Sequence, residues 1–433
     1  MDSIESSSVD HTNGKMHWKK QLPPLLQGFY FQLLAGINDA NLGIILPSIK
    51  AQYGLTQYVV SIVFLCTTAG YMLAAVMNGY LIRKYNQVGT AMIGSVSLVA
   101  GYLVFSCPIP FPVLCVFMIF IGFGLALVQS CSNVISSQMP RSTVILNFLH
   151  AFYGFGALLG PLIASGLPGW QDTYRLFCGL SGFSIVLQLF TFHDYDPPVE
   201  QQESSTTDKD HQRIMYDTLH QPILYACAVF LLLYVGTEVC IGNWGYTFLI
   251  TARSNDTTAM AHIMTGYWGG ICAGRLGLSW LTFKIGEKKM IYSYVSVLIG
   301  MLFLLWFVPL VSVNATALVI IGITIGPLFP TTVALTTKVV PDHLRATTIG
   351  FLCAFGSGGS ALFPYAGGVL IGSLGVRSLL PFCISMAIMM LISWIFVPNP
   401  DSTHTFYCWI KNRLGKKTSN QPTTDSISLT IIT

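Results

Sequence analysis

Long apolar runs recur along this chain of 433 residues and constrain its fold more than any other feature. A helix needs about 20 apolar residues to cross the roughly 30 Å hydrocarbon layer of a bilayer. Charged residues make up only 9% of the chain and hydrophobic residues 53%, a balance far from that of soluble domains. The sequence therefore predicts an all-α polytopic membrane protein with twelve transmembrane helices. We expect them near 25–48, 57–80, 89–107, 112–137, 146–167, 174–192, 223–250, 260–283, 290–310, 316–339, 346–371 and 379–397.

The basic residues indicate on which side of the membrane the termini lie. Cytoplasmic loops carry an excess of Lys and Arg, and an even number of spans places both termini on one side. Most of the 22 basic residues fall on the side of the termini, and the loops of the other side hold Lys50, Arg175, Arg253 and Arg377. We therefore expect a multi-pass protein of the plasma membrane with cytoplasmic termini. The N-glycosylation sequons at Asn255 and Asn314 fall in expected outer loops.

A polar stretch over 193–222 that contains three prolines and several acids divides the spans into two groups of six. We expect a cytoplasmic tail over 1–24, a six-helix bundle over 25–192, a cytoplasmic linker over 193–222, a second bundle over 223–397 and a cytoplasmic tail over 398–433. Short pairs recur in the same order in both groups, about 200 residues apart. They are Gly36 with Asp39 against Gly236 with Glu238, Gly70-Tyr71 against Gly266-Tyr267, and Phe155-Gly156 against Phe355-Gly356. Such duplication predicts two pseudo-symmetric bundles with a central site between them.

Asp39 and Glu238 are the only acidic residues inside otherwise apolar spans, and they occupy matching points of the two halves. A charge at bilayer depth costs about 2.5 to 3.5 kcal/mol on insertion scales, so such residues usually mark an ion or substrate site. The alternative is an acid that reaches the interface or a neutralised packing group. We expect both carboxylates to take part in proton coupling, and Asp39 to gain and lose a proton during transport.

Four motifs, taken in order, resemble the major facilitator superfamily and within it the fucose-permease-like branch and its fungal relatives. They are Asn38-Asp39 in span one; Gly79-Tyr80-Leu81-Ile82-Arg83-Lys84 after span two; Leu146-Asn147 and Phe155-Gly156-Ala157 in span five; and Gly274-Arg275-Leu276 with Ser279-Trp280-Leu281 in span eight. The wider superfamily has an Asp where Arg83 stands, whereas the branch has a basic residue. The resemblance implies a rocker-switch transporter with its substrate between the two halves.

The resemblance also implies an Asp in span one and an acid in span four that serve sugar recognition and proton coupling. Asp39 matches the first, but the second position holds Gln129, which cannot titrate. Glu238 in span seven is the residue that we expect to take over part of this role.

Polar residues share helix faces at spacings of three and four, and a wet cavity for a hydroxyl-rich solute needs such donors and acceptors. The expected substrate-binding residues are Gln32, Asn38, Gln129, Asn133, Asn147, His150, Trp244 and Tyr267. The alternative is that the amides join helices and the aromatic rings fill the core.

Arg275 has no acidic neighbour in its own span, and a lone guanidinium at membrane depth is costly. A structural pair with Glu238 would satisfy both charges and competes with a coupling role for Glu238. Arg275 could instead extend to the cytoplasmic face.

The chain lacks a P-loop, the HExxH and GxSxG motifs, clusters of zinc-ligand spacing and a basic stripe, which argues against an enzyme, a metal or other cofactor site, and nucleic-acid binding. We expect a monomeric secondary active transporter that moves a small organic solute across a lipid bilayer by alternating access. A sugar or polyol that enters with protons follows the resemblance. Export of a hydrophobic metabolite or drug is the alternative within transport, and a transport-dead membrane sensor or scaffold is the alternative outside it.

Overall fold

The computed structural model describes residues 2–139, 142–193, 208–341 and 344–398, and every regular element within them is helical. The helices of the first half are α1 (Asp2–Tyr53), α2 (Gln57–Val60), α3 (Ile62–Phe105), α4 (Phe111–Ser137), α5 (Ser142–Gly166) and α6 (Trp170–Thr191). The short helix α7 (Asp208–Leu219) lies in the linker. The second half contains α8 (Pro222–Ala252), α9 (Thr257–Ile285), α10 (Glu287–Phe307), α11 (Val311–Ile325), α12 (Leu328–Val339), α13 (Arg345–Leu374), the 3₁₀ turn η3 (Val376–Ser378) and α14 (Leu379–Ile395).

Ten segments of the described chain are long and apolar enough to cross a membrane. The predicted all-α polytopic fold is therefore confirmed. One of the ten segments, Gln57–Phe105, covers two of the spans that the sequence predicts, and α9 coincides with the predicted eighth span. The predicted tenth span is divided between α11 and α12 at Pro327, which lacks the amide hydrogen that a continuous helix requires.

Helix α3 contains two of the predicted spans, and Asn86 interrupts the helix between them. The Asn86 backbone has φ 58° and ψ −177°, a positive-φ conformation that residues other than glycine rarely adopt and that no continuous helix contains. Its side-chain oxygen accepts a hydrogen bond of 2.9 Å from the amide of Gly89, and its carbonyl accepts one of 2.7 Å from the hydroxyl of Thr90. Asn86 therefore ends one helix and caps the next, so that the chain crosses the bilayer twice along α3.

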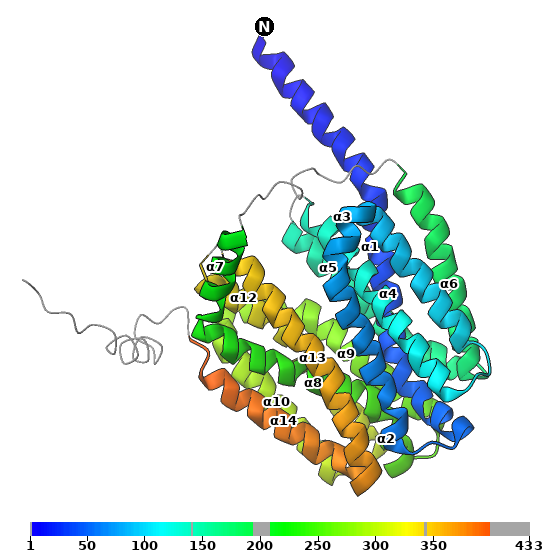
Figure 1. Ribbon diagram of the computed structural model, residues 1–433. Coiled ribbons are helices and arrows are strands. Elements are labelled where there is room, and N and C mark those ends of the chain that lie inside the picture. The colour runs from blue at the N-terminus through cyan, green and yellow to red at the C-terminus, as the bar shows by residue number, and fades with distance from the viewer. Residues whose placement is uncertain (1, 140–141, 194–207, 342–343, 399–433) are drawn as a thin grey trace, which may run out of the picture.

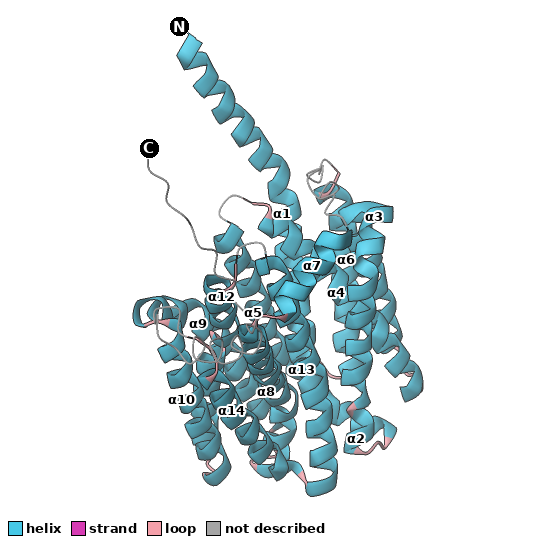
Figure 2. Cartoon of the chain, turned by 60° about the vertical axis from the view of Figure 1, so that its left-hand side comes forward, coloured by secondary structure: helices cyan, strands magenta, loops and turns pink. Residues whose placement is uncertain are grey.

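The helices of the first half pack mainly on one another, as do those of the second half. Figure 1 shows the two groups side by side, the first running from blue through cyan to the green of α6 and the second from the green of α8 through yellow to the orange of α14. Contacts between the halves are made by α5 with α9, by α1 with α8, and by α13 with α2 and α3. Figure 2, turned by 60°, shows α13 beside α2 at the end of the molecule opposite the N-terminus. Side chains at these contacts are the ones available to a site between the halves.

Helix α1 begins at Asp2, so the expected tail over 1–24 continues into the first span as one helix and extends beyond the bundle in Figure 1. Its apolar segment starts at Gln21, near the predicted boundary. Part of the linker, over 194–207, and the C-terminal tail from 399 lie outside the described residues. The remaining domain limits stay predictions.

Candidate functional site

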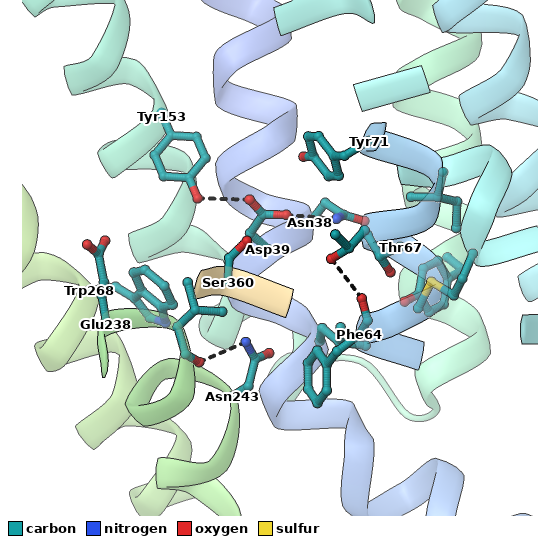
Figure 3. Close-up of a pocket in the computed structure, with 16 residues that line it drawn as sticks. Asn38, Asp39, Phe64, Thr67, Tyr71, Tyr153, Glu238, Asn243, Trp268 and Ser360 are labelled. Atoms are coloured by element: carbon teal, nitrogen blue, oxygen red, sulfur yellow. Dashed lines mark hydrogen bonds between the residues drawn. The ribbon is translucent and has the colours of Figure 1, made fainter. Parts of the chain in front are cut away.

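Asp39 lies in the apolar, membrane-spanning part of α1 and accepts two hydrogen bonds from neutral side chains. The amide of Asn38 donates to one carboxylate oxygen at 3.2 Å, and the hydroxyl of Tyr153 on α5 donates to the other at 2.8 Å. The hydroxyl of Tyr102 donates in turn to the Asn38 carbonyl oxygen at 3.0 Å. Figure 3 shows the Tyr153 hydroxyl pointing toward Asp39. Among the described residues no ion pair involves Asp39, so a change in the charge of its carboxylate breaks none.

Two glycines allow α1 and α5 to approach closely enough for the Asp39–Tyr153 contact. A Cβ atom on Gly36 would overlap the backbone carbonyl of Tyr153, and one on Gly156 would overlap the carbonyl of Leu33. Small residues at helix interfaces permit such close packing within a membrane. The Gly36–Asp39 and Phe155–Gly156 patterns therefore position Tyr153 against the acid three residues beyond Gly36.

A cavity of about 120 Å³ lies between the two halves and contains Asp39 in its wall. Most of the lining side chains carry a polar group, and the rest supply an apolar surface. The first half contributes Asn38, Asp39, Leu42, Phe64, Thr67, Thr68, Tyr71, Met118, Ile121, Tyr153 and Tyr174, and the second half contributes Glu238, Val239, Asn243, Trp268 and Ser360. A mixed polar and apolar lining is typical of a site for a small organic solute.

Several polar atoms of the cavity wall are already bonded within the protein. The hydroxyls of Thr67 and Thr68 donate to carbonyls of their own helix, and Tyr71 accepts a hydrogen bond of 3.2 Å from Gln129. Asn243 donates to the carbonyl of Val239 at 2.9 Å, whereas its Oδ1 atom has no partner among the described residues. Asn243 is only 4% exposed, and this oxygen is an unused acceptor in the wall of the cavity. An acceptor in this state favours a ligand that donates a hydrogen bond.

Glu238 and Arg275 form an ion pair between α8 and α9. The distance from Arg275 Nη2 to Glu238 Oε1 is 3.1 Å, and the two side chains are 19% and 7% exposed, respectively. The pairing that the sequence offered as one alternative is thus present. It compensates the burial of both charges, and a coupling role for Glu238 in addition remains a proposal.

Three of the ten residues that we expected to couple protons or bind substrate line the cavity, namely Asn38, Asp39 and Glu238. Gln129 lies behind the lining, where it orients Tyr71 through their hydrogen bond. Gln32 is buried and Asn133 is half-buried, and neither lines this cavity. His150 lies one turn before Tyr153 on α5, within electrostatic reach of Arg275 but outside the lining. The side chain of Asn147 lies outside the described residues.

Trp244 and Tyr267, which we expected to bind substrate, do not line the cavity. Both side chains are fully enclosed. The Trp244 indole donates to the carbonyl of Pro364 at 2.7 Å and packs edge-on against Phe64, and the Tyr267 hydroxyl donates to the carbonyl of Glu238 at 2.8 Å. They hold helices together, as the alternative interpretation of buried aromatic residues anticipated.

Tyr71, Tyr153, Asn243, Trp268 and Ser360 line the cavity although the sequence analysis did not select them. Two of them left a signal in the sequence. Tyr71 belongs to the repeated Gly-Tyr pair, and Tyr153 follows His150 by three residues on the expected polar face. The other three carried no comparable signal.

The two sequons differ in accessibility. Asn255 is exposed in the loop between α8 and α9. Asn314 is fully buried in α11, where its amide donates to the carbonyls of Val308 and Leu310 and its oxygen accepts from Arg253. A glycan on Asn314 would have to replace these hydrogen bonds, so its buried position argues against modification of this residue.

Helices that span a bilayer, arranged in two halves around a polar cavity, define a membrane transporter of small molecules. A family model described as Major Facilitator Superfamily matches residues 29–364. The chain belongs to this superfamily, and it is a multi-pass integral membrane transporter rather than an enzyme.

Relatives with related sequences cover most of the chain. "Bypass of stop codon protein 6" of Saccharomyces cerevisiae is 25% identical over 406 residues, which cover 86% of this chain and 82% of the yeast protein. The "Glucose/mannose transporter GlcP" of Bacillus subtilis is 20% identical over 348 residues, which cover 78% of this chain and 85% of that protein.

Solved structures share the fold. The nucleoside transporter NupG matches with a TM-score of 0.71 at 14% identity, over 86% of this chain and 99% of NupG. The transporter FucP in its outward conformation matches with a TM-score of 0.60 at 17% identity, over 87% of this chain and 99% of FucP. The resemblance stated from the motifs is confirmed.

Proposed function

We propose that this transporter moves a small, neutral, hydroxyl-rich solute, a sugar or a polyol, together with protons. The observation that carries the proposal is the cavity between the halves, in which Asp39 is hydrogen-bonded to Asn38 and Tyr153. A site that both halves line is available to either side of the membrane in turn when the halves rock against each other.

The chemistry of the cavity wall supports a polar cargo. A sugar ring presents hydroxyls at its edge and C–H groups on its faces. The unpartnered oxygen of Asn243 accepts from a hydroxyl, while Trp268 and Phe64 offer apolar surface to a ring face. The Bacillus subtilis relative is named for glucose and mannose, which makes D-glucose the first probe.

Asp39 supplies the proton step in this proposal. As a carboxylate it accepts hydrogen bonds through both oxygens, and as a carboxylic acid it is neutral and one oxygen becomes a donor. A proton that enters from one side binds Asp39, crosses with the loaded cavity and leaves to the other side. We place the protein in the plasma membrane with cytoplasmic termini, and we expect a monomer to suffice because one chain builds the whole cavity.

Uptake by purified protein in liposomes tests the proposal. Radiolabelled D-glucose, a polyol and a lipophilic dye are offered with and without an inward proton gradient. We expect the gradient to drive accumulation of a polar solute in the wild type. Asp39→Asn should abolish the accumulation but retain solute exchange without a gradient, because the amide keeps the shape of the site and cannot release a proton.

Asp172→Asn is the matched control, because Asp172 is a partly exposed acid on α6 that pairs with Arg175 outside the cavity. It should behave as wild type. Gradient-driven uptake in Asp39→Asn would remove Asp39 as the coupling group. Transport of the dye alone would replace the polar cargo by a hydrophobic one, and no transport of any probe would favour a sensor or scaffold.

A further inference from the structure

Tyr153 belongs to the first half but lies where that half meets the second. Its neighbour Gly154 faces α9 so closely that a Cβ atom there would be 3.3 Å from the Cβ of Cys272. Cys272 precedes Arg275 by three residues on the same helix. The hydroxyl that binds Asp39 is therefore carried by a helix that packs directly against the helix of the ion pair.

Charged and titratable groups surround the Tyr153 hydroxyl from four other helices. Asp39 on α1 is its hydrogen-bond acceptor, and Tyr71 on α3, Glu238 on α8 and Arg275 on α9 all lie within its electrostatic reach. On its own helix, His150 lies near Arg275. Charged groups interact more strongly inside a protein, where water is largely excluded, than they do in water.

We propose that Tyr153 is a positioning residue that links the protonation of Asp39 in the first half to the Glu238–Arg275 pair in the second half. The inference rests on the proposed proton coupling. When Asp39 is ionised, its charge strengthens the hydrogen bond from Tyr153 and holds the hydroxyl on the side of α1. When Asp39 takes up a proton, this bond weakens and the Tyr153 hydroxyl becomes available as a donor to Glu238. A new hydrogen bond to Glu238 would compete with the Arg275 guanidinium and weaken the ion pair.

The pH dependence of D-glucose uptake in liposomes tests this link. The Tyr153 hydroxyl favours the ionised form of Asp39, so its removal in Tyr153→Phe lets Asp39 keep its proton to higher pH. We expect the midpoint of the pH profile to move up by about one to two pH units, the value of a hydrogen bond to a charged group. Exchange of D-glucose without a gradient should persist, which a merely misfolded variant would not show.

Tyr30→Phe is the matched control, since Tyr30 also donates one hydrogen bond, to the carbonyl of Leu180 at 2.9 Å, away from Asp39. It should leave the midpoint unchanged. The link to the second half is tested with the charge-neutral double variant Glu238→Gln/Arg275→Gln. This pair of changes should shift the midpoint when Tyr153 is present and have no further effect when it is combined with Tyr153→Phe.

The outcomes separate the two proposals. A wild type without pH dependence overturns proton coupling and this inference together. A pH-dependent wild type with an unshifted Tyr153→Phe overturns the role of Tyr153 alone. Equal shifts by the Glu238/Arg275 changes with and without Tyr153 would mean that the halves communicate by another route, and would also overturn the inference.

Discussion

Gly368 of α13 packs directly against Ser61, the residue between α2 and α3, so that a Cβ atom on Gly368 would overlap the Ser61 hydroxyl. Ser61 is fully buried and its hydroxyl donates to the carbonyl of Gln57 at 2.6 Å. The same Cβ atom would lie 2.7 Å from the Trp244 ring. The contact closes the halves at the end of the molecule that contains α2, and it tolerates no side chain at position 368.

Gly368→Ala should therefore hinder closure at this end. Overpacking costs about 1 to 3 kcal/mol, which corresponds to a fall in uptake rate of roughly 5- to 150-fold if closure limits transport. Binding of D-glucose, measured by thermal shift, should be retained because the cavity wall is unchanged. Gly350→Ala on the same helix is the control, since no atom lies within 4 Å of a Cβ there. Equal uptake by both variants would show that the contact is not required.

The Glu238–Arg275 pair should dominate the stability of the second half. Glu238→Gln leaves the buried guanidinium without its carboxylate, which costs about 3 to 5 kcal/mol in comparable buried pairs. Adding Arg275→Gln should restore much of the loss, because no buried charge then remains. Thermal unfolding in detergent measures both effects. Glu287→Gln, which removes the partner of the half-exposed Lys338, should cost less than about 1 kcal/mol. A Glu238→Gln variant that unfolds at the wild-type temperature would exclude a structural pair.

Asn243→Leu tests cargo recognition. If a cargo hydroxyl donates to the unused oxygen of Asn243, the Leu variant lacks this acceptor. The affinity for D-glucose should then fall by roughly 5- to 150-fold, which corresponds to about 1 to 3 kcal/mol of binding free energy. Asn78→Leu is the control, because Asn78 bonds Ser130 and its oxygen is also unpartnered, but outside the cavity. Equal affinities for both variants would place the cargo elsewhere.

The exposure of the two sequons predicts where a glycan is found. Asn255→Gln should abolish the mass shift that a glycosidase produces on protein from eukaryotic cells, and Asn314→Gln should leave it unchanged. A shift that depends on Asn314 would contradict the buried position of this residue.

Terminal tags should stain with antibody only after the cells are permeabilised, since we expect cytoplasmic termini. Staining of intact cells would reverse the proposed orientation.

Charge was the feature that sequence reasoning handled best. Asp39, Glu238 and Arg275 stand out because ionised groups are rare in apolar spans, and Asn38 followed from its motif. The apolar runs likewise predicted the helical fold. Two of the predicted spans follow each other within α3, separated by the break at Asn86.

The aromatic residues of the cavity could not be chosen in the same way. Tyrosine and tryptophan are frequent in this chain, and whether a ring lines a cavity or fills a helix interface depends on a rotation of its helix by a fraction of a turn. Tyr267 and Trp268 show this, since adjacent residues of α9 place one ring in a fully enclosed interface and the other at the cavity. Gln129 was expected to bind substrate on the same kind of argument, but its amide contacts Tyr71 and reaches the site only through that residue.

The partners of the two membrane acids have a consequence for the speed of transport. Asp39 is held by Asn38 and Tyr153 of its own half, and Glu238 is held by Arg275 of its own half. Separating the halves therefore breaks none of these bonds and strands neither acid. The rocking motion is therefore opposed by packed surfaces such as Gly368 on Ser61, and not by the hydrogen bonds and the ion pair that hold the two acids.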